Sequence, residues 1–360
     1  MMNDDMNMGF HSNLNLKEEM PSLGTTSSLG PDQFFWGNGK VLLAGEYLVL
    51  EGGKGLGLPT KWGQSLSVRY NQSFTPILHW KSYDYQGNIW FEARFEFWRF
   101  NLLDDNTSEA ALILQKILRQ ARKQNPHFLR DDVEVIAETK VSFPMDWGLG
   151  SSSTLIHNIA SWAFTGPFEL LFKTMGGSGI DVAVAQADGP ILYEKKGATP
   201  QWSHVQFSPP FATELYFVYL GKKQKTSSSV ELFKKKQYSK EYLNKIIMQI
   251  NPLVDAMISC TEGDHFSNLM NDHEAILSKL LEIPSIRLTH FSDFNGTVKS
   301  LGAWGGDFIL AYSKDGKEKV EEYFKSKNCS TILTFDQMVF SGPVNLMNNF
   351  TSQVNYGTRH

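Results

Sequence analysis

The sequence predicts an α+β fold in two lobes. Segments with the two-residue alternation of strands and segments with helical spacing both occur along its 360 residues. They do not alternate regularly, as they would in a doubly wound sheet. At about 150 residues per domain, this length favours two domains or one bilobal unit. We expect a leader at 1–30, an N-terminal lobe at 31–205 and a C-terminal lobe at 206–360.

Residues 1–30 are rich in Met, Asn, Ser and Gly and show little periodicity, which is typical of a disordered leader. Ordered structure is expected from near Phe34. Strand patterns follow in the first lobe at 40–50, where Gly45-Glu46 interrupts the pattern, and at 65–70, 88–98 and 132–138. The segment 108–124 predicts a helix, because it has helical spacing, basic residues in its last turns and Pro126 behind it.

The later part of the chain continues this mixture. A helix is expected at 152–165, and the segment 167–196 predicts a helix, a glycine-rich turn, a short helix and a strand. The segment 300–312 predicts a small-residue turn and then a strand. The remaining expected elements are strands at 214–220 and 331–334 and helices at 239–258, 265–282 and 315–327.

The composition excludes several classes of protein. A formal net charge of −4 and a pI near 6.2 give no basic field to attract nucleic acid or an anionic membrane. The two cysteines, Cys260 and Cys329, lack metal-ligand spacing, which argues against a disulfide framework or a zinc site. No apolar run approaches the roughly 18 residues that span a bilayer, and no signal-peptide pattern is present. We expect a soluble cytoplasmic protein without nucleic-acid or membrane partners, and a homodimer stays open.

The stretch FPMDWGLGSSSTLIHNIASW, residues 143–162, predicts an anion-binding helix start. The candidate phosphate-binding residues in it are two glycines, the leucine between them and three serines: Gly148, Leu149, Gly150, Ser151, Ser152 and Ser153. A helix start has unpaired N–H groups and a partial positive charge, and glycines let a phosphate approach the backbone. An ordinary helix N-cap needs one serine, whereas this stretch has three in a row. Phosphate binding is therefore favoured, although the chain has no G-x-x-x-x-G-K-[ST] loop.

Three further stretches carry candidate functional residues. GNGKVLLAGEY contains Lys40 at the start of a strand and Glu46 beside a glycine break. GGSGID ends on Asp181, and GAWGGD begins at Gly302. Taken singly, each has an ordinary explanation: a solvated lysine, a carboxylate that interacts with a helix dipole, or a tight turn.

Taken in order, these four motifs resemble those of the GHMP kinases, the family of galactokinase, homoserine kinase, mevalonate kinase and phosphomevalonate kinase. The resemblance spans about residues 34–335, and Gly-Leu-Gly-Ser-Ser-Ser is its most specific motif. The segments 38–68 and 177–195 are most similar to the GYDIA branch, whose pentapeptide stands here as Gly179–Ala183 with Ile180 in place of Tyr. The resemblance implies an N-terminal lobe like ribosomal protein S5 domain 2 and a ferredoxin-like C-terminal lobe. ATP and a small alcohol would meet between them.

The resemblance also implies roles for single residues. Asp181 matches the family's catalytic aspartate, and Lys40 matches the lysine beside it. The residues that would bind or support the ATP phosphates are Gly148, Leu149, Gly150, Ser151, Ser152, Ser153, Gly302, Gly305 and Gly306. The residues on the substrate side would be Glu46, Tyr47 and Gly179. The Mg²⁺ ligands would be Ser152 and Glu169.

The sequence departs from the family pattern at three positions. Asn38 stands where a proline usually precedes Gly-Lys, and Tyr47 stands where a histidine often follows Gly-Glu. Trp304 replaces a glycine of the last motif, which is also one residue short. A bulky indole there puts the contact of this motif with nucleotide in question.

The resemblance favours mevalonate as the acceptor and leaves phosphomevalonate, homoserine and sugars as alternatives. A phosphorylated acceptor needs extra cations, for which Lys54, Lys61 and Lys140 are the candidates. A non-catalytic sensor of nucleotide and metabolite is a competing hypothesis, and so is a decarboxylase on the same fold. The presence of both Asp181 and Lys40 argues against the sensor, because such a protein is expected to lose one of them.

Overall fold

Helices and strands mix along the chain as the α+β class predicts. The computed structural model describes residues 31–73, 75–104, 107–130, 133–221, 231, 233–302 and 307–342. The expected leader, residues 1–30, lies outside this part of the chain. From Asp32 on, the described residues form one compact unit.

The larger sheet carries the first half of the chain. Its strands are β1 (Gln33–Ala44), β2 (Gly55–Gln72), β3 (Ile77–Tyr83), β4 (Ile89–Glu96), β5 (Val133–Val141), β6 (Ile191–Lys196) and β7 (Thr199–His204). They follow the order β4-β3-β5-β2-β6-β7, and β1 pairs with β2. The β3–β5 pair is parallel, whereas the other pairs in this sheet are antiparallel.

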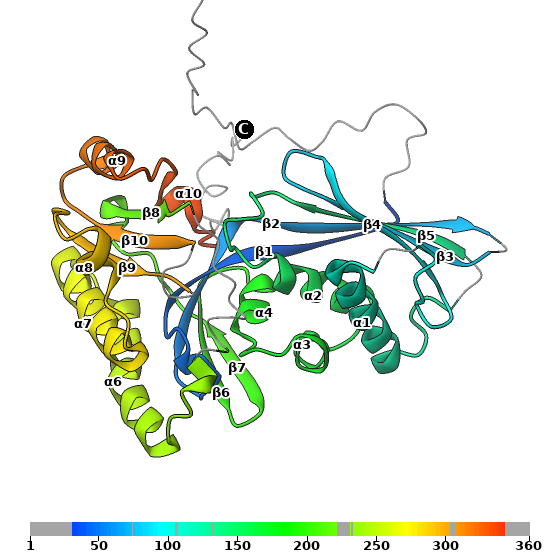
Figure 1. Cartoon of the computed structure of the whole chain (residues 1–360), viewed down its shortest axis with the longest axis horizontal. Coiled ribbons are helices and arrows are strands. Elements are labelled where there is room, and N and C mark those ends of the chain that lie inside the picture. Colours follow the sequence, from blue (N-terminus) through cyan, green and yellow to red (C-terminus); the bar gives the residue numbers. More distant parts are fainter. Residues whose placement is uncertain are drawn as a thin grey trace, which may run out of the picture. The chain divides into compact units, whose positions relative to one another are not determined.

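Four helices cover one face of this sheet (Figure 1): α1 (Glu109–Gln124), α2 (Ser151–Trp162), α3 (Pro167–Thr174) and α4 (Ile180–Ala185). The side chain of Ser108 accepts a hydrogen bond from the Ala111 N–H and so caps α1. Apolar residues of α1 and α2, such as Leu114 and Ile159, pack against strand residues such as Val68 and Ala137. This packing holds the start of α2 against β1 and β2.

The smaller sheet carries the second half of the chain. Its strands are β8 (Leu215–Tyr219), β9 (Thr297–Ser300), β10 (Phe308–Tyr312) and β11 (Ile332–Thr334), in the order β11-β8-β10-β9. The helices around it are α6 (Lys240–Ser259), α7 (Gly263–Leu281), α8 (Ile286–His290), α9 (Lys317–Ser326) and α10 (Phe335–Met338). Because side chains alternate along β8, Val218 joins a cluster with Phe324 of α9, whereas Phe217 joins the cluster that contains α6 and α7 residues.

The two sheets meet in one apolar core. A single cluster of buried side chains includes Leu43 of β1, Leu58 of β2, Phe217 of β8 and Ile250 of α6. The sheets divide the chain between β7 and β8, and the lobe boundary expected after residue 205 falls in that connection. The boundary itself stays a prediction, since the packing is continuous across it.

Most expected elements are present, with one clear correction. The expected strand at 40–50 ends at Ala44, and a 3-10 turn at Leu48–Leu50 replaces its second half. Gly45 at φ 92° and Tyr47 at φ 62° take the chain out of the extended conformation. The sequence analysis did not predict β3, β7 or β9.

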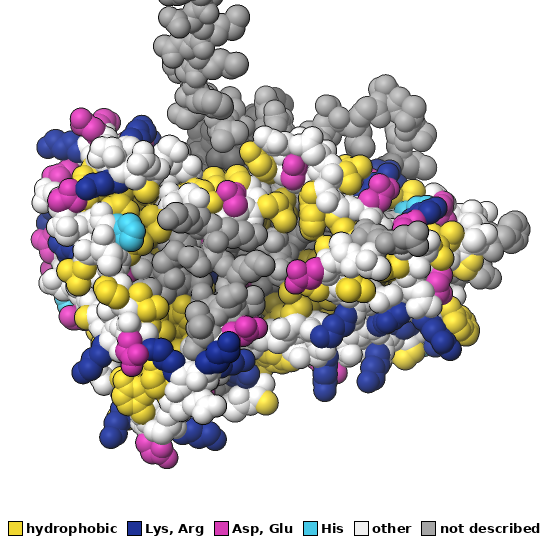
Figure 2. Space-filling model, viewed as in Figure 1, with side chains coloured by type: hydrophobic (Ala, Val, Ile, Leu, Met, Phe, Trp, Pro, Cys, Tyr) yellow, Lys and Arg dark blue, Asp and Glu magenta, His cyan; other side chains and the backbone are white. Residues whose placement is uncertain are grey.

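Charges of both signs are mixed over the face in Figure 2, where several basic side chains project from the region that α1 occupies in Figure 1. Cations of α1 bind neighbouring backbone. Lys116 donates a hydrogen bond to the carbonyl of Thr174, and Arg119 donates one to the carbonyl of Arg99. Within the described ranges, no helix combines the length and the apolar character needed to cross a membrane.

Candidate active site

The glycine-rich loop lies at the start of α2, as the sequence predicts. Gly148 and Gly150 have φ values of 65° and 88°, which favour glycine. A Cβ atom at Gly150 would lie 2.9 Å from Cγ of Lys40, and one at Gly148 would lie 1.7 Å from Oδ2 of Asp307. The loop therefore needs glycine both for its backbone conformation and for close contacts on either side. In the first turn of α2 the N–H of Ser153 already donates to the carbonyl of Gly150 at 3.0 Å, so the N–H groups of Ser151 and Ser152 are the ones that could bind an anion.

Lys40 joins this loop to the candidate catalytic aspartate. Its backbone N–H donates to the carbonyl of Leu149 at 2.9 Å, and its side chain crosses Gly150. Its Nζ then lies 3.3 Å from Oδ2 of Asp181. The lysine side chain is 11% exposed and the aspartate 32%, so the carboxylate can still be reached by a small molecule. Lys40 thus contacts two other motifs, the glycine loop through Leu149 and Gly150 and the third motif through Asp181.

Asp181 is positioned by the turn that precedes α4. Gly179 caps this helix at φ 97°, where a Cβ atom would meet the hydroxyl of Tyr193 at 2.8 Å. The same hydroxyl donates a hydrogen bond to the carbonyl of Ser178. Burial and the nearby charge of Asp181 raise the pKa of Tyr193, so it stays a neutral donor. Gly179, expected on the substrate side, therefore helps to position the candidate catalytic aspartate.

A small cavity, here called the phosphate-loop cavity, brings the first two motifs to the last one. It is lined by Lys40, Val41, Leu42, Trp147, Gly148, Leu149, Leu301, Gly302, Asp307 and Phe308. Gly302 lines this cavity together with Gly148, and its expected role at the nucleotide stays a prediction. Gly305, Gly306 and Trp304 lie outside the described residues.

Aromatic packing attaches the phosphate loop to the smaller sheet. The ring of Trp147 stands edge-on to Trp62 at 5.3 Å and to Phe308 at 5.5 Å between centroids. Tyr219 of β8 donates a hydrogen bond to the carboxylate of Asp146 at 2.7 Å. Residues Asp146 and Trp147, which lead into the glycine loop, are thus held by contacts with strands of the smaller sheet.

An apolar cavity of about 290 Å³ opens beside the start of α2. Its apolar lining includes Trp80, Trp90, Phe91, Ile113, Leu114 and Leu155. Ser151 and Ser152 lie on its wall, together with the polar side chains of Gln64, Ser82 and Glu109. A largely apolar hollow with a few polar groups next to an anion site has the chemistry of a nucleobase pocket.

Glu46 and Tyr47 are buried. Glu46 is 2% exposed, and its Oε1 lies 2.5 Å from Nζ of Lys299. Tyr47 packs on Phe233, with 5.4 Å between the ring centroids. Both residues follow β1 directly, close in sequence to Lys40. In this structure both side chains contact other protein residues. Their expected contact with a substrate stays a prediction.

The residues expected to hold Mg²⁺ lie on different helices. Ser152 is exposed in the first turn of α2, whereas Glu169 is exposed on α3 and makes no ion pair within the described ranges. No group of three potential metal-binding side chains occurs in that part of the chain. Mg²⁺ does not require one, since it often binds through one or two protein oxygens and substrate phosphates. The exposed hydroxyl of Ser152 and the exposed carboxylate of Glu169 are oxygen donors of the kind this ion binds, and both assignments stay predictions.

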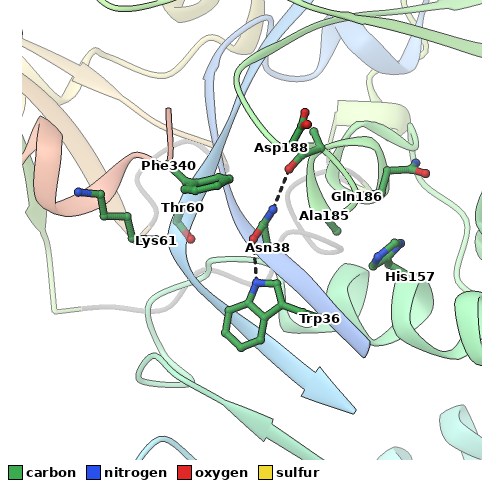
Figure 3. A pocket seen from close by; sticks show the side chains of 10 residues that line it. Trp36, Asn38, Thr60, Lys61, His157, Ala185, Gln186, Asp188 and Phe340 are labelled. Atoms are coloured by element: carbon green, nitrogen blue, oxygen red, sulfur yellow. Dashed lines mark hydrogen bonds between the residues drawn. The ribbon is translucent and has the colours of Figure 1, made fainter. Parts of the chain in front are cut away.

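Asn38, at the position of the family's usual proline, links β1 to the end of α4. Its Oδ1 accepts a hydrogen bond from Trp36 Nε1 at 2.8 Å, and its Nδ2 donates to the carbonyl of Ala187 at 2.7 Å. Figure 3 shows these contacts at the wall of a cavity of about 340 Å³, which His157 and Phe340 also line. This cavity shares no lining residue with the phosphate-loop cavity. The departure at Asn38 thus supports the strand that carries Lys40.

Sequence reasoning missed three residues around the site: Tyr193, Lys299 and Asp307. Tyr193 and Lys299 are both buried. A tyrosine or a lysine in a short strand pattern does not indicate which residue its side chain will contact, so the sequence could not reveal either role. Asp307 follows directly on the last glycine motif, and this position was the one signal that could have indicated it.

No family model matches the sequence, and no curated protein matches it. Solved structures do match. Mevalonate kinase of Methanococcus jannaschii aligns with a TM-score of 0.61 at 16% identity, over 84% of this chain and 96% of that one. Phosphomevalonate kinase of Streptococcus pneumoniae, in complex with phosphomevalonate and AMPPNP, aligns with a TM-score of 0.60 at 15% identity, over 84% and 99%. Galactokinase of Lactococcus lactis, complexed with galactose, gives 0.58 at 13% identity, over 87% and 95%. The chain therefore has the fold that these three kinases share.

Proposed function

We propose that this chain is an ATP-dependent kinase of the GHMP family, which transfers the γ-phosphate of ATP to a hydroxyl group of a small molecule. The observation that carries the proposal is the ion pair of Lys40 and Asp181, 3.3 Å apart, beside the glycine loop at the start of α2. The shared fold supports it, because mevalonate kinase, phosphomevalonate kinase and galactokinase have this fold. A phosphate site and a partly exposed carboxylate are the two groups that such a transfer needs.

ATP fits the two hollows beside α2. The adenine ring would occupy the apolar cavity, and the phosphates would lie against the N–H groups of Gly150, Ser151 and Ser152. Mg²⁺ bound with the nucleotide, held by Ser152 and Glu169, would supply neutralisation of phosphate charge. The positive end of α2 contributes in the same direction.

Asp181 and Lys40 act on the acceptor. Phosphoryl transfer passes through a loose transition state, so alignment of the hydroxyl oxygen matters more than its early deprotonation. The free Oδ1 side of Asp181 would accept the hydroxyl proton late in the transfer. Lys40 holds the aspartate in place from the other side, and its stem over Gly150 fixes it relative to the phosphates.

Mevalonate is the acceptor that we propose first. A phosphorylated acceptor would need additional cations, yet two of the three candidate lysines are occupied. Lys54 lies 2.5 Å from Asp255, and Lys61 lies 3.1 Å from Asp336. The third, Lys140, is exposed on β5. This pattern favours an acceptor without a phosphate group, with phosphomevalonate as the alternative.

The test is acceptor-dependent ADP release by the purified chain with Mg²⁺ and ATP. Mevalonate, phosphomevalonate, homoserine and galactose are supplied in turn, and a reaction without acceptor gives the background. We expect ADP release well above background with mevalonate. Nucleotide binding without acceptor-dependent ADP would contradict a kinase, and release of CO₂ together with phosphate would identify a decarboxylase instead.

A further inference from the structure

A buried ion pair joins the first motif to the strand before the last motif. Glu46 follows β1, whereas Lys299 lies in β9, and their charged atoms are 2.5 Å apart. Lys299 is fully buried, and its Nζ also donates to the carbonyl of Ser300 at 2.9 Å. The pair therefore connects segments that are 253 residues apart in sequence.

A second set of polar contacts reinforces this connection. The N–H of Gly45 donates to Nε2 of His273 on α7 at 3.1 Å. The next residue on that helix, Glu274, accepts hydrogen bonds from the N–H and the hydroxyl of Ser300. The turn after β1, helix α7 and strand β9 are thus held together by buried polar groups.

A buried ion pair of this kind adds little net stability, because removing its charges from water is unfavourable. Burial removes both charges from water, and replacing a buried ion pair by apolar residues of similar size is often neutral or stabilising. The geometry that the pair imposes is its more distinctive property. Lys299 and Glu46 can satisfy each other only when the turn after β1 and the strand β9 stand at one distance.

The two ends of the pair lead into opposite walls of the phosphate-loop cavity. On one side, β1 supplies the lining residues Lys40, Val41 and Leu42 and reaches Glu46 through one short turn. On the other side, the lining residues Leu301 and Gly302 follow Lys299 almost directly. The pair is therefore a fixed contact that lies close to both walls along the chain.

We propose that the Glu46–Lys299 pair fixes the distance between the two walls of the phosphate-loop cavity and thereby positions Lys40 for phosphoryl transfer. Glu46 and Lys299 are then positioning residues that do not touch the acceptor. This inference rests on the proposed kinase function, which it deepens by giving Glu46 a role other than binding the substrate.

The test compares Lys299→Met, Glu46→Met and the double variant by steady-state kinetics and thermal unfolding. Each single variant leaves one buried charge unpaired, so its unfolding temperature should fall. The double variant removes both charges and should recover most of that loss. Its kcat should nevertheless stay at least about 10-fold below wild type, with KM for ATP changed less than about 3-fold, because a small misplacement of a catalytic group costs rate.

Other outcomes contradict the proposal. Recovery of kcat together with stability in the double variant would show a purely structural pair. A rise of the acceptor KM in Glu46→Met that Lys299→Met does not share would show that Glu46 binds the acceptor. Lys299→Arg keeps the charge but moves it, so this milder variant should fold and still lower kcat. Lys314→Met is the control, since Lys314 forms an exposed pair with Asp264 at 2.6 Å and should leave both quantities unchanged.

A readout without turnover separates this inference from the kinase function. Hydrogen exchange should rise in both segments, 40–46 and 299–302, when the double variant is compared with wild type. This result would support the positioning role even if no acceptor were phosphorylated, which would itself contradict only the proposed function. Unchanged exchange in either segment would overturn the positioning role.

Discussion

Asp181 and Lys40 owe their arrangement to backbone features more than to their own contacts. Lys40 reaches Asp181 because Gly150 leaves room for its stem, and Asp181 faces it because Gly179 and Tyr193 shape the turn before α4. The sequence predicted this pair through resemblance alone. A lysine at a strand start and an aspartate in a first helical turn are each common, and their contact depends on packing that no local pattern reveals.

Substitution of Asp181 tests its catalytic role. Asp181→Ala should bind ATP nearly as wild type does but turn over at least ~100-fold more slowly, since general acid–base help commonly contributes this much. Acceptor-dependent ADP release and nucleotide titration measure the two quantities. Asp188→Ala is a suitable control, because Asp188 is exposed and pairs with His204 at 3.0 Å. Turnover near the wild-type rate in Asp181→Ala would remove this residue from the mechanism.

The contact between Gly150 and Lys40 can be tested separately from backbone strain. Gly150→Ala places a methyl group against the lysine stem and should lower kcat at least about 10-fold, because the displaced amine no longer holds Asp181. Gly197→Ala introduces the same methyl group at φ 62° with no atom within 4 Å. It should cost about 1–2 kcal/mol of stability, as a left-handed residue does, and leave kcat unchanged. Equal kinetics in the two variants would show that the contact is unimportant.

At the scale of elements, helices were predicted more completely than strands. The helix expected at 108–124 matches α1 closely, because Ser108 caps it and basic residues end it. The strand β9 is four residues long and contains a buried lysine, so its sequence resembles a solvated loop. The apolar cavity was missed for a related reason. Alternation identifies the inward face of a strand but does not show where helices leave that face uncovered.

Filling the apolar cavity tests its assignment to the nucleobase. Ala110 lines it from the first turn of α1, so Ala110→Phe should raise KM for ATP at least about 10-fold by occupying the space of the ring. The fold should persist, because the cavity is open to solvent on one side. Leu112→Phe on the same helix, where Leu112 is half exposed, controls for the added ring. An unchanged KM for ATP in Ala110→Phe would place the base elsewhere.

At the scale of the whole molecule, two buried groups on α7 link stability to pH in opposite directions. Burial lowers the pKa of His273 well below 6.5, and the charge of Lys299 adds to this. Unfolding lets this histidine take up a proton, so its contribution is present above pH 6.5 and lost as the pH falls. Burial raises the pKa of Glu274 from 4.5 to about 7, against the opposing effect of Lys299. Its contribution is present below pH 4.5 and lost as the pH rises to about 7.

Glu274→Gln should therefore change the pH dependence of unfolding. The variant keeps a neutral side chain at all pH values, so its stability relative to wild type should increase between pH 4.5 and pH 8. The change is on the order of 3 kcal/mol, since one pKa unit corresponds to about 1.4 kcal/mol. Denaturant unfolding at several pH values measures it. A difference between variant and wild type that does not vary with pH would contradict the shifted carboxyl group.

The central claim is that a triphosphate lies against the first turn of α2 with its terminal phosphate directed at Asp181. A crystal structure of the chain with AMPPNP, Mg²⁺ and mevalonate tests it most directly. We expect the base in the apolar cavity, the phosphates along Gly148–Ser152, and a hydroxyl group of the acceptor between the γ-phosphate and the Asp181 carboxylate. A nucleotide bound elsewhere, or an Asp181 side chain turned away from it with no space for an acceptor, would contradict the account.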